Sequence, residues 1–467
     1  MKRIKWFSFV LAAIAFVGCS DDNAETPPPA TEPVVLTTPK VTFTVTETSV
    51  AFSWEAVEHA SGYEYRLQKA SETVKEAKVD AETLQALVDV PKGSEIYILK
   101  VRALGTGDYT DSEWSRNTVL TPEPKPTNIE FADAVLEKYL LSMQPSIDLD
   151  GDGKISFEEA AAVTEIDAGY EYAEDATADN TFSNLSGLEY FTSLERLNLK
   201  YHRVSDATPI EGLASLTSLN LGENQITKLD LSKLANLTDL RLYGTGVSTL
   251  DLSKTPLLKS LYLQRTALTE IDLSPLTDLE EAYINEAKLT KLRAVGLKGL
   301  TRLDAVKNAL TTVEIGNCNE LSQLHLDNNR LTAIELKGLP KLMILNLYAN
   351  SLTALDTSNL PFLMQLSVFE NQIASVDFSA NPALRNVYLT QNPLTKIDLS
   401  ANENIMLLEA INMSNLEEIN LKNGYWAEYY IVEGNPALKK VIVDPGYEFE
   451  LVTTLFKNRP DVSIVTE

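Results

Sequence analysis

One apolar pattern constrains the fold of this chain more than any other feature, because it returns at a fixed interval. The unit Leu-x-x-Leu-x-Leu begins at Leu194 and again at Leu216, and from Leu216 onward it begins every 21 residues. A chain that returns to the same register in this way stacks as coils, and each coil buries its apolar edge only against its neighbours. The pattern therefore predicts a solenoid. The first leucines of the regular units are Leu216, Leu237, Leu258, Leu279, Leu300, Leu321, Leu342, Leu363 and Leu384.

A column of asparagines predicts how each coil is closed. Asparagine stands three residues after the last leucine of most units, where its amide can satisfy main-chain groups exposed by the turn that leaves the strand. The column holds Asn224, Asn308, Asn329, Asn350, Asn371 and Asn392, while Thr245, Thr266 and Ala287 replace asparagine in three units. We expect a buried ladder of asparagines that is thinner in those three units.

A second apolar pair follows in each coil, as at Leu229 and Leu231, and no amphipathic helix pattern lies between the two. We therefore expect two extended segments per coil and a narrow, β-rich solenoid. The motif over residues 186–194, Ser-Gly-Leu-Glu-Tyr-Phe-Thr-Ser-Leu, and the helical segment before it resemble the internalins, a family of leucine-rich-repeat proteins. The resemblance implies a leucine-rich-repeat solenoid over residues 181–422, a C-terminal cap over 423–467, and recognition of another protein through the concave face.

The outward positions of the first extended segment line the concave face of such a solenoid. Aromatic side chains gather there in two clusters, with one histidine between them. Aromatic rings with polar tips are frequent hot spots of protein interfaces, and their faces also stack on sugar rings. The candidate partner-binding residues are Tyr243, Tyr262, Tyr283, His325, Tyr348, Phe369 and Tyr388. The alternative is that the rings only stabilise the sheet by cross-strand packing.

Residues 148–159 contain the sharpest ligand motif, D-x-D-x-D-G-x₅-E. Ca²⁺ takes roughly six to eight oxygen ligands in a flexible shell, and this spacing supplies them. The candidate ligands are the carboxylates of Asp148, Asp150, Asp152 and Glu159, the main-chain carbonyl of Lys154, and an oxygen or bridging water at Ser156. Helical patterns flank the loop, as in an EF-hand. We therefore expect a helical, EF-hand-like N-cap over residues 127–180 that holds one structural Ca²⁺.

An acidic column follows the second extended segment of the coils. It comprises Asp230, Asp251, Asp272, Glu314, Glu335, Asp356, Asp377 and Asp398, and Arg293 interrupts it. Stacked coils would set these side chains about 5 Å apart. The column is either a stripe that binds cations or a basic partner, or a solvated face whose aspartates accept hydrogen bonds from the following turn. We favour the second, because adjacent carboxylates repel one another.

Residues 40–122 predict an antiparallel β-sandwich. Apolar residues alternate along several short segments, for instance at Tyr97, Leu99 and Val101, and turn residues separate the segments. Together with Trp54 in an early segment, the pattern resembles a fibronectin type III domain. Such a domain is usually a spacer.

The N-terminus has the features of a secretion signal. A basic start is followed by an apolar stretch too short to span a bilayer, which indicates a signal peptide over residues 1–19. The stretch ends at Gly18-Cys19, which resembles the lipobox of bacterial lipoproteins, so Cys19 would carry the lipid anchor and hold the protein to the membrane. The acidic residues that follow resemble the export tag of surface lipoproteins, and residues 20–39 form a flexible Pro/Thr-rich linker. We expect an outer-membrane lipoprotein exposed on the cell surface.

Composition and motif content argue against two classes of function, nucleic-acid binding and catalysis. The formal net charge of −26 repels phosphate backbones, so we expect no nucleic-acid partner. The three histidines are isolated, and no hydrolase, metalloprotease or phosphate-loop motif occurs, so we expect no enzyme. The leading hypothesis is a surface protein that binds another protein. The alternatives are a glycan-capture lipoprotein of a nutrient-uptake system and, third, an unrecognised hydrolase.

Overall fold

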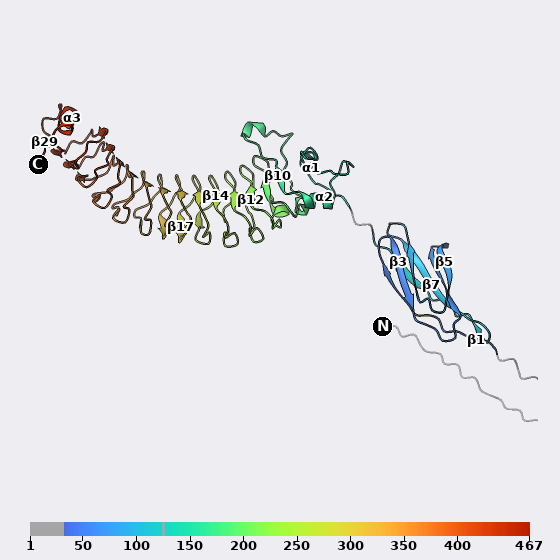
Figure 1. Cartoon of the computed structure of the whole chain (residues 1–467). Coiled ribbons are helices and arrows are strands. Elements are labelled where there is room, and N and C mark those ends of the chain that lie inside the picture. Colours follow the sequence, from blue (N-terminus) through green and yellow to red (C-terminus); the bar gives the residue numbers. More distant parts are fainter. Residues whose placement is uncertain (1–31, 124–126) are drawn as a thin grey trace, which may run out of the picture. The chain divides into compact units, whose positions relative to one another are not determined.

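The computed structural model describes residues 32–123 and 127–467. The chain divides into two compact units, Met1–Pro126 and Thr127–Glu467, each described by itself below (Figure 1). Cys19 and the expected signal peptide lie outside the described residues. Among the residues described, no helix has the length and apolar character needed to cross a membrane.

The first unit consists of two antiparallel sheets with a buried core between them. One sheet has the order β2-β3-β6 and the other the order β5-β4-β7-β9. Side chains alternate between core and surface, so that Tyr97, Leu99 and Val101 of β7 are all buried. The strands are β2 (Val41–Val45), β3 (Ser49–Trp54), β4 (Gly62–Lys69), β5 (Glu72–Asp80), β6 (Gln85–Asp89), β7 (Ile96–Leu104) and β9 (Asn117–Leu120).

The first unit begins earlier than its composition indicates. β1 (Val34–Val35) pairs in parallel with β8 (Tyr109–Thr110), and Leu36 is buried in the core of this unit. Residues 34–36 therefore belong to the folded unit and not to the linker expected over residues 20–39. The sequence does not reveal this strand, because two residues are too few to show an alternating pattern.

A buried carboxylate joins two strands of the larger sheet. The oxygens of Glu64 on β4 accept hydrogen bonds from Arg66 (2.7 Å) and Arg102 (2.6 Å), and both guanidinium groups lie over the Trp114 ring. Burial raises the pKa of Glu64, but the hydrogen bonds from Arg102 and Arg66 outweigh it and hold that pKa below its ordinary value. Glu64 therefore stays ionised under a cover of arginine and tryptophan.

Thirteen parallel strands form one sheet of the second unit, as the repeat predicts. From β12 to β25 the paired central residues are 21 apart, for example Leu324 and Leu345. The first and last strands lie inside the two expected caps, so the stack extends beyond residues 181–422 at both ends. The strands are β10 (Glu165–Asp167), β11 (Arg196–Asn198), β12 (Ser218–Asn220), β13 (Asp239–Arg241), β14 (Ser260–Tyr262), β16 (Glu281–Tyr283), β18 (Arg302–Asp304), β20 (Gln323–His325), β21 (Ile344–Asn346), β22 (Gln365–Ser367), β23 (Asn386–Tyr388), β25 (Leu407–Glu409) and β27 (Tyr429–Ile431).

The second extended segment forms sheets in only two stretches of the stack. The coils curve, and β17 lies on the outer side of the curve (Figure 1). Coils are farther apart on the outer side of a bend, so ladder hydrogen bonds close there only locally. One sheet contains β15 (Glu270–Asp272), β17 (Lys291–Val295) and β19 (Thr312–Gly316), and the other β24 (Lys396–Asp398), β26 (Glu418–Asn420), β28 (Lys440–Ile442) and β29 (Ser463–Val465).

The asparagine column forms the expected ladder inside the stack. Asn371 donates from its side-chain nitrogen to the main-chain oxygens of Leu347 and Val368, both at 3.0 Å. Its side-chain oxygen accepts from the Leu352 N–H at 2.9 Å. One buried amide thus satisfies three main-chain groups in two coils. The register also places Cys318 in the core, where it is fully buried between Leu297 and Leu339 of the same column.

Where threonine replaces asparagine, the ladder is thinner, as expected. The hydroxyls of Thr245 and Thr266 donate only to the main-chain carbonyl three residues earlier, at 2.6 and 2.8 Å. A second ladder, which the periodicity does not reveal, lies in the Cys318 column. There Asn381 donates to the main-chain oxygens of the preceding coil, and Asn402 in turn donates to the main-chain oxygen of Asn381.

The residue before the first ladder column takes a left-handed backbone in coil after coil, although only two of the residues, Gly244 and Gly434, are glycine. Their φ values include 66° at Tyr201, 57° at Glu223 and 52° at Ala349. The other members are Gly244, Arg265, Glu286, Lys307, Asn328, Glu370, Gln391, Asn412 and Gly434. Each coil therefore pays about 1 kcal/mol for a tight turn, which the buried asparagine next to it helps to offset.

Helices close both ends of the stack. α1 (Ala134–Leu141) and α2 (Phe157–Ala162) pack against the first coils, and short 3₁₀ turns follow at Ala173–Asp175, Leu188–Tyr190 and Thr208–Ile210. At the other end α3 (Tyr447–Leu455) follows β28, and the Tyr430 hydroxyl of β27 donates to the buried carboxylate of Glu448 on α3. This hydrogen bond ties the helix to the last strand of the thirteen-stranded sheet.

The asparagine ladder predicts a loss of unfolding free energy when one of its side chains is removed. Replacing Asn371 with alanine leaves the buried Leu352 N–H without a partner, while the carbonyls of Leu347 and Val368 each keep one hydrogen bond, from Asn350 and Asn392. We therefore expect the unfolding free energy to fall by about 2 kcal/mol. Urea denaturation followed by circular dichroism measures the change. Asn404→Ala is the matched control, because the side chain of Asn404 is exposed and bonds a single carbonyl. A loss at Asn371 no larger than the loss at Asn404 would contradict the ladder.

Candidate functional site

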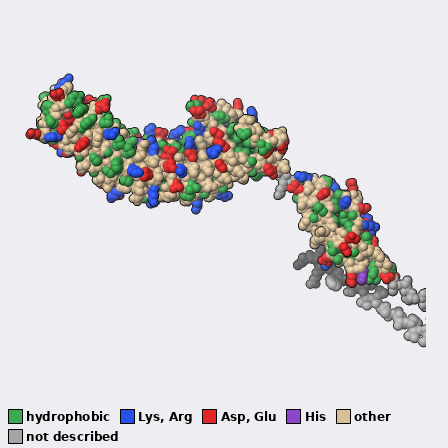
Figure 2. All heavy atoms as spheres, viewed as in Figure 1, with side chains coloured by type: hydrophobic (Ala, Val, Ile, Leu, Met, Phe, Trp, Pro, Cys, Tyr) green, Lys and Arg blue, Asp and Glu red, His purple; other side chains and the backbone are tan. Residues whose placement is uncertain are grey.

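The outward residues of the thirteen-stranded sheet form a continuous face on the inner side of the curve (Figure 1). Each strand of this sheet except β27 buries its central residue and turns the two flanking residues outward, as in β14, where Leu261 is buried and Tyr262 is half-buried. We call this surface the concave face. In Figure 2 charged side chains gather over the middle coils, while hydrophobic side chains gather toward the C-terminal end.

Two tyrosines on the concave face form the centre of a four-layer stack. The Tyr262 and Tyr283 rings are nearly parallel, with centroids 5.1 Å apart. Arg241 lies over the Tyr262 ring at 4.7 Å, and Arg302 lies over the Tyr283 ring at 5.3 Å. The four residues come from consecutive strands in the order β13, β14, β16 and β18, so each arginine covers the ring face that points away from the other tyrosine. Both faces of each ring are therefore occupied within the chain.

One carboxylate holds this stack in place. Glu281 accepts hydrogen bonds from the hydroxyls of Tyr262 (2.6 Å) and Tyr283 (3.2 Å). Burial and the hydrogen bond to Glu281 raise the pKa of Tyr262 to about 12. The hydrogen bond from Tyr262 lowers the pKa of Glu281, so this carboxylate is ionised at neutral pH.

Beside the stack lies a cluster of buried polar groups that are incompletely paired. Asp304 is only 7% exposed; one of its oxygens pairs with Arg302 at 3.2 Å, and the other, Oδ1, is buried without a partner. His325 on the next strand bonds the Asn346 amide through Nδ1 at 2.8 Å, while its Nε2 is buried without a partner. Burial lowers the pKa of His325, with a further contribution from Arg302, so the imidazole is neutral at pH 7. We call Arg302, Asp304 and His325 the central polar cluster.

A second aromatic pair flanks this cluster on its C-terminal side. Tyr348 and Phe369 are parallel within 9°, with centroids 4.3 Å apart. Burial and a hydrogen bond to Asp327 raise the pKa of Tyr348, and Asp327 itself is only 3% exposed. The two aromatic pairs and the central polar cluster thus follow one another along the concave face.

The structure regroups the residues that the sequence assigned to two aromatic clusters. Tyr243 lies over Gly222, whose missing Cβ leaves room for the ring, because a Cβ there would meet ring atoms at 2.5 Å. Tyr388 stacks on no other aromatic ring of the described residues. The six aromatics are half-buried and not fully exposed, since neighbours on adjacent coils cover them. The spacing in the sequence predicted the aromatic columns of the concave face correctly. It did not reveal the arginines, Glu281 and Asp304 that organise these columns.

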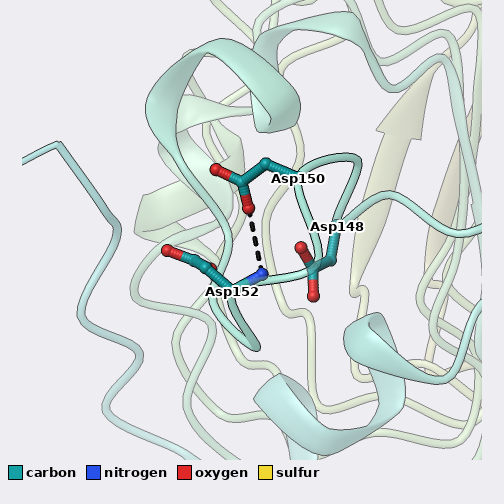
Figure 3. Close-up of side chains that lie close together, drawn as sticks. All are labelled: Asp148, Asp150 and Asp152. Atoms are coloured by element: carbon teal, nitrogen blue, oxygen red, sulfur yellow. Dashed lines mark hydrogen bonds between the residues drawn. The ribbon is translucent and has the colours of Figure 1, made fainter.

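The loop of residues 148–159 forms a separate acidic site at the N-terminal end of the stack. The carboxylates of Asp148, Asp150 and Asp152 converge, and one oxygen from each lies within 4.8 Å of the others (Figure 3). Main-chain N–H groups shape the loop: Asp148 accepts from Gly151 (2.8 Å), and Asp150 accepts from Asp152 (3.0 Å). This donor set fits a hard divalent cation such as Ca²⁺.

Glu159, the expected closing ligand, lies outside that close group. Its oxygens accept from the N–H groups of Leu149 (2.7 Å) and Ser156 (2.8 Å), and the Ser156 hydroxyl caps α2 in return. These hydrogen bonds lower the pKa of Glu159. The loop is also supported from outside, because Asn128 pairs with Ser156 as a β-bridge and the Asn128 amide donates to Asp152 at 3.2 Å.

The acidic column on the outer side of the coils is explained by local hydrogen bonds. An aspartate oxygen accepts from the N–H two residues later, as in Asp230 with Ser232 (2.8 Å) and Asp377 with Ser379 (2.9 Å). Arg293 bridges its neighbours Asp272 and Glu314. The column therefore caps turns, as the second interpretation predicted, and does not converge on a common ligand.

Comparison with known proteins identifies the fold of the second unit. Neither protein-family models nor curated proteins give a match. Among solved structures, the functional domain of InlJ from Listeria monocytogenes, which includes a cysteine ladder, is 24% identical over 72% of this chain and 69% of that chain, with a TM-score of 0.53. An internalin, InlF, from the same species is 20% identical over 72% of this chain and 96% of that chain, with a TM-score of 0.48. The first likeness shows a leucine-rich-repeat solenoid of the internalin kind, and it shows the fold alone.

The tyrosine stack can be tested by titration. We expect Tyr262 to ionise near pH 12, about two units above an ordinary tyrosine, because burial and Glu281 both disfavour the phenolate. Near-ultraviolet difference absorbance of wild type against Tyr262→Phe isolates this group. Glu281→Gln should lower its pKa by removing the adjacent negative charge. A pKa of about 10 for Tyr262 in the wild type, as in an ordinary tyrosine, would rule out the buried hydrogen-bonded pair of Tyr262 and Glu281.

Proposed function

We propose that this protein is a lipid-anchored surface protein that binds another protein through its concave face. The observation that carries the proposal is the central polar cluster. Arg302, Asp304 and His325 leave three buried polar atoms without partners, each at a cost of about 1–3 kcal/mol. These atoms are inaccessible in the free protein, so a partner offsets the cost by drawing the part-exposed side chains of Arg302 and His325 toward itself and supplying the missing hydrogen bonds. The flanking aromatic pairs and arginines have the composition of interface hot spots.

The stack of Tyr262 and Tyr283 argues for a protein partner over a glycan. Sugar binding by aromatic residues uses a free ring face, whereas both faces of these two rings are occupied by Arg241, Arg302 and each other. A rigid aromatic stack with a polar edge suits a protein surface instead. Capture of a glycan for nutrient uptake is the second candidate, supported only by the outer faces of Tyr348 and Phe369.

In this proposal the remaining parts of the chain serve to hold the solenoid at the cell surface. Acylation of Cys19 would anchor the mature N-terminus to the outer membrane, and residues 20–33 would follow as a linker. The two-sheet unit would act as a fibronectin type III-like spacer, supported by its three-plus-four strand arrangement and its aromatic core. The solenoid would then be presented at the cell surface.

We further propose that the loop of residues 148–159 binds one structural Ca²⁺. The three converging aspartates support this, together with Gly151 and Gly153, whose positive φ values let the loop fold tightly. Ca²⁺ would neutralise those carboxylates and draw Glu159 toward the shell. The effect would be to stiffen the first coils, because Asn128 and α2 are attached to the same loop.

Calcium binding is measured by calorimetry on the full chain after chelation. We expect one site with a dissociation constant of about 10⁻⁴–10⁻³ M and a rise in melting temperature on saturation. Asp150→Asn should weaken binding roughly tenfold or more, whereas Asp179→Asn, an exposed aspartate outside the loop, should not change it. Absence of both heat and thermal shift in the wild type would exclude the site.

Partner binding is measured by screening the full chain against arrays of extracellular protein domains and of glycans. We expect a protein ligand, and we expect Tyr348→Ala, Phe369→Ala and Tyr388→Ala together to weaken its binding about 100-fold or more.

The matched control is the triple variant Glu270→Ala, Lys291→Ala and Thr312→Ala, which alters exposed residues of β15, β17 and β19 on the outer side. It should bind like wild type. Recognition of glycans alone, or equal loss in both triple variants, would overturn the assignment to the concave face.

A further inference from the structure

One column of residues changes character along the stack. It lies immediately before each of the ten strands from β12 to β25 of the thirteen-stranded sheet, and successive members are joined by main-chain hydrogen bonds of 2.7–2.9 Å. In chain order the column reads Thr217, Thr238, Lys259, Glu280, Thr301, Ser322, Met343, Met364, Arg385 and Met406. Three of the six methionines in the chain therefore stand in this column, within four adjacent coils.

In the first six coils, the side chains of this column are paired within the chain. The hydroxyls of Thr238 and Thr301 donate to the carbonyl of the preceding coil, both at 3.0 Å, and Thr217 and Ser322 do the same. Lys259 and Glu280 form an ion pair with each other at 3.0 Å. Here the column supports the stack.

In the last four coils this support is absent, and an apolar surface replaces it. Met343 and Met406 are 41% and 43% exposed, and thioethers cannot make the hydroxyl bond that threonine makes. Ile344 and Leu407, the next residues in the chain, are also partly exposed, which widens the stripe. In Figure 2 hydrophobic side chains gather over these C-terminal coils. An apolar stripe that replaces stabilising hydrogen bonds indicates a contact surface.

Arg385 is the one charge within this stripe. It is exposed between Met364 and Met406 and has no ion-pair partner among the described residues. A guanidinium between apolar neighbours attracts a carboxylate, and the apolar surroundings strengthen the pair by excluding water. The stripe thus favours an apolar ligand with one acidic group near its middle.

We propose that Met343, Met364, Arg385 and Met406 bind an amphipathic helix of another protein, whose apolar face carries one carboxylate opposite Arg385. The coil spacing of about 4.8 Å comes close to the helical pitch of about 5.4 Å, so each turn of the helix meets one coil. An extended strand fits less well, because its same-face side chains recur at about 6.6 Å. Flexible methionines adapt to such helices. This contact lies beside the concave face and does not depend on the function proposed for it.

The test uses the full chain and two synthetic peptides of about 14 residues, roughly 21 Å long as helices. Both carry leucines on one face; one has a central glutamate on that face and the other a lysine. Fluorescence anisotropy should show binding of the glutamate peptide and at least about tenfold weaker binding of the lysine peptide. Arg385→Glu should reverse this preference.

The decisive variant replaces Met343, Met364 and Met406 with threonine, which restores the pattern of the first coils. It should bind the glutamate peptide at least about tenfold more weakly and melt no lower than wild type. Thr238→Met, in the same column at the other end, and the concave triple variant should bind like wild type. The proposal is overturned by no binding of the glutamate peptide to wild type, by equal binding to the methionine variant, or by binding of phospholipid vesicles in its place.

Discussion

Hydrogen bonds between residues one coil apart determine everything else in the second unit. A strand of three residues is too short to be stable alone, and each coil presents main-chain groups and leucines that only the next coil can satisfy. The strict 21-residue return keeps these groups in register, and the buried asparagines close the turns between them. The inner sheet is continuous and lies on the inner side of the curved stack, where it forms the concave face.

This regularity turns sequence columns into spatial rows. Residues 21 apart lie on neighbouring strands, so Arg241, Tyr262 and Tyr283 become layers of one stack although they are far apart in the chain. The same rule brings Asp304 beside His325 and sets Met364 next to Arg385. A functional surface on such a scaffold is built by changing one column at a time, without disturbing the leucines that hold the coils together.

The part of the fold that depends on this periodicity could be predicted from sequence. The leucine register, the asparagine ladder, its weakening at Thr245 and the burial of Cys318 all follow from the repeat. Strands that do not follow the 21-residue repeat could not be predicted in this way. The strand at Val34–Val35 has no apolar pattern, and β10 and β27 use irregular coil lengths at the ends of the stack.

The candidate sites could likewise be predicted from the sequence only in part. The aspartates at 148, 150 and 152 converge because their spacing is local, whereas Glu159 is drawn away by hydrogen bonds that the motif does not encode. On the concave face, spacing identified the aromatic columns but not which rings pair. Pairing depends on neighbours from adjacent strands, such as Glu281, whose role becomes visible only after the coils are stacked.

Amide hydrogen exchange on the full chain tests whether coils one repeat apart hold each other through buried hydrogen bonds. The N–H groups of Leu331, Leu352 and Ile373 each donate to an asparagine of the next coil. We expect slow exchange at these three amides, repeated every 21 residues, with fast exchange at exposed turn residues between them. Uniformly fast exchange at the three positions in the native protein would contradict it.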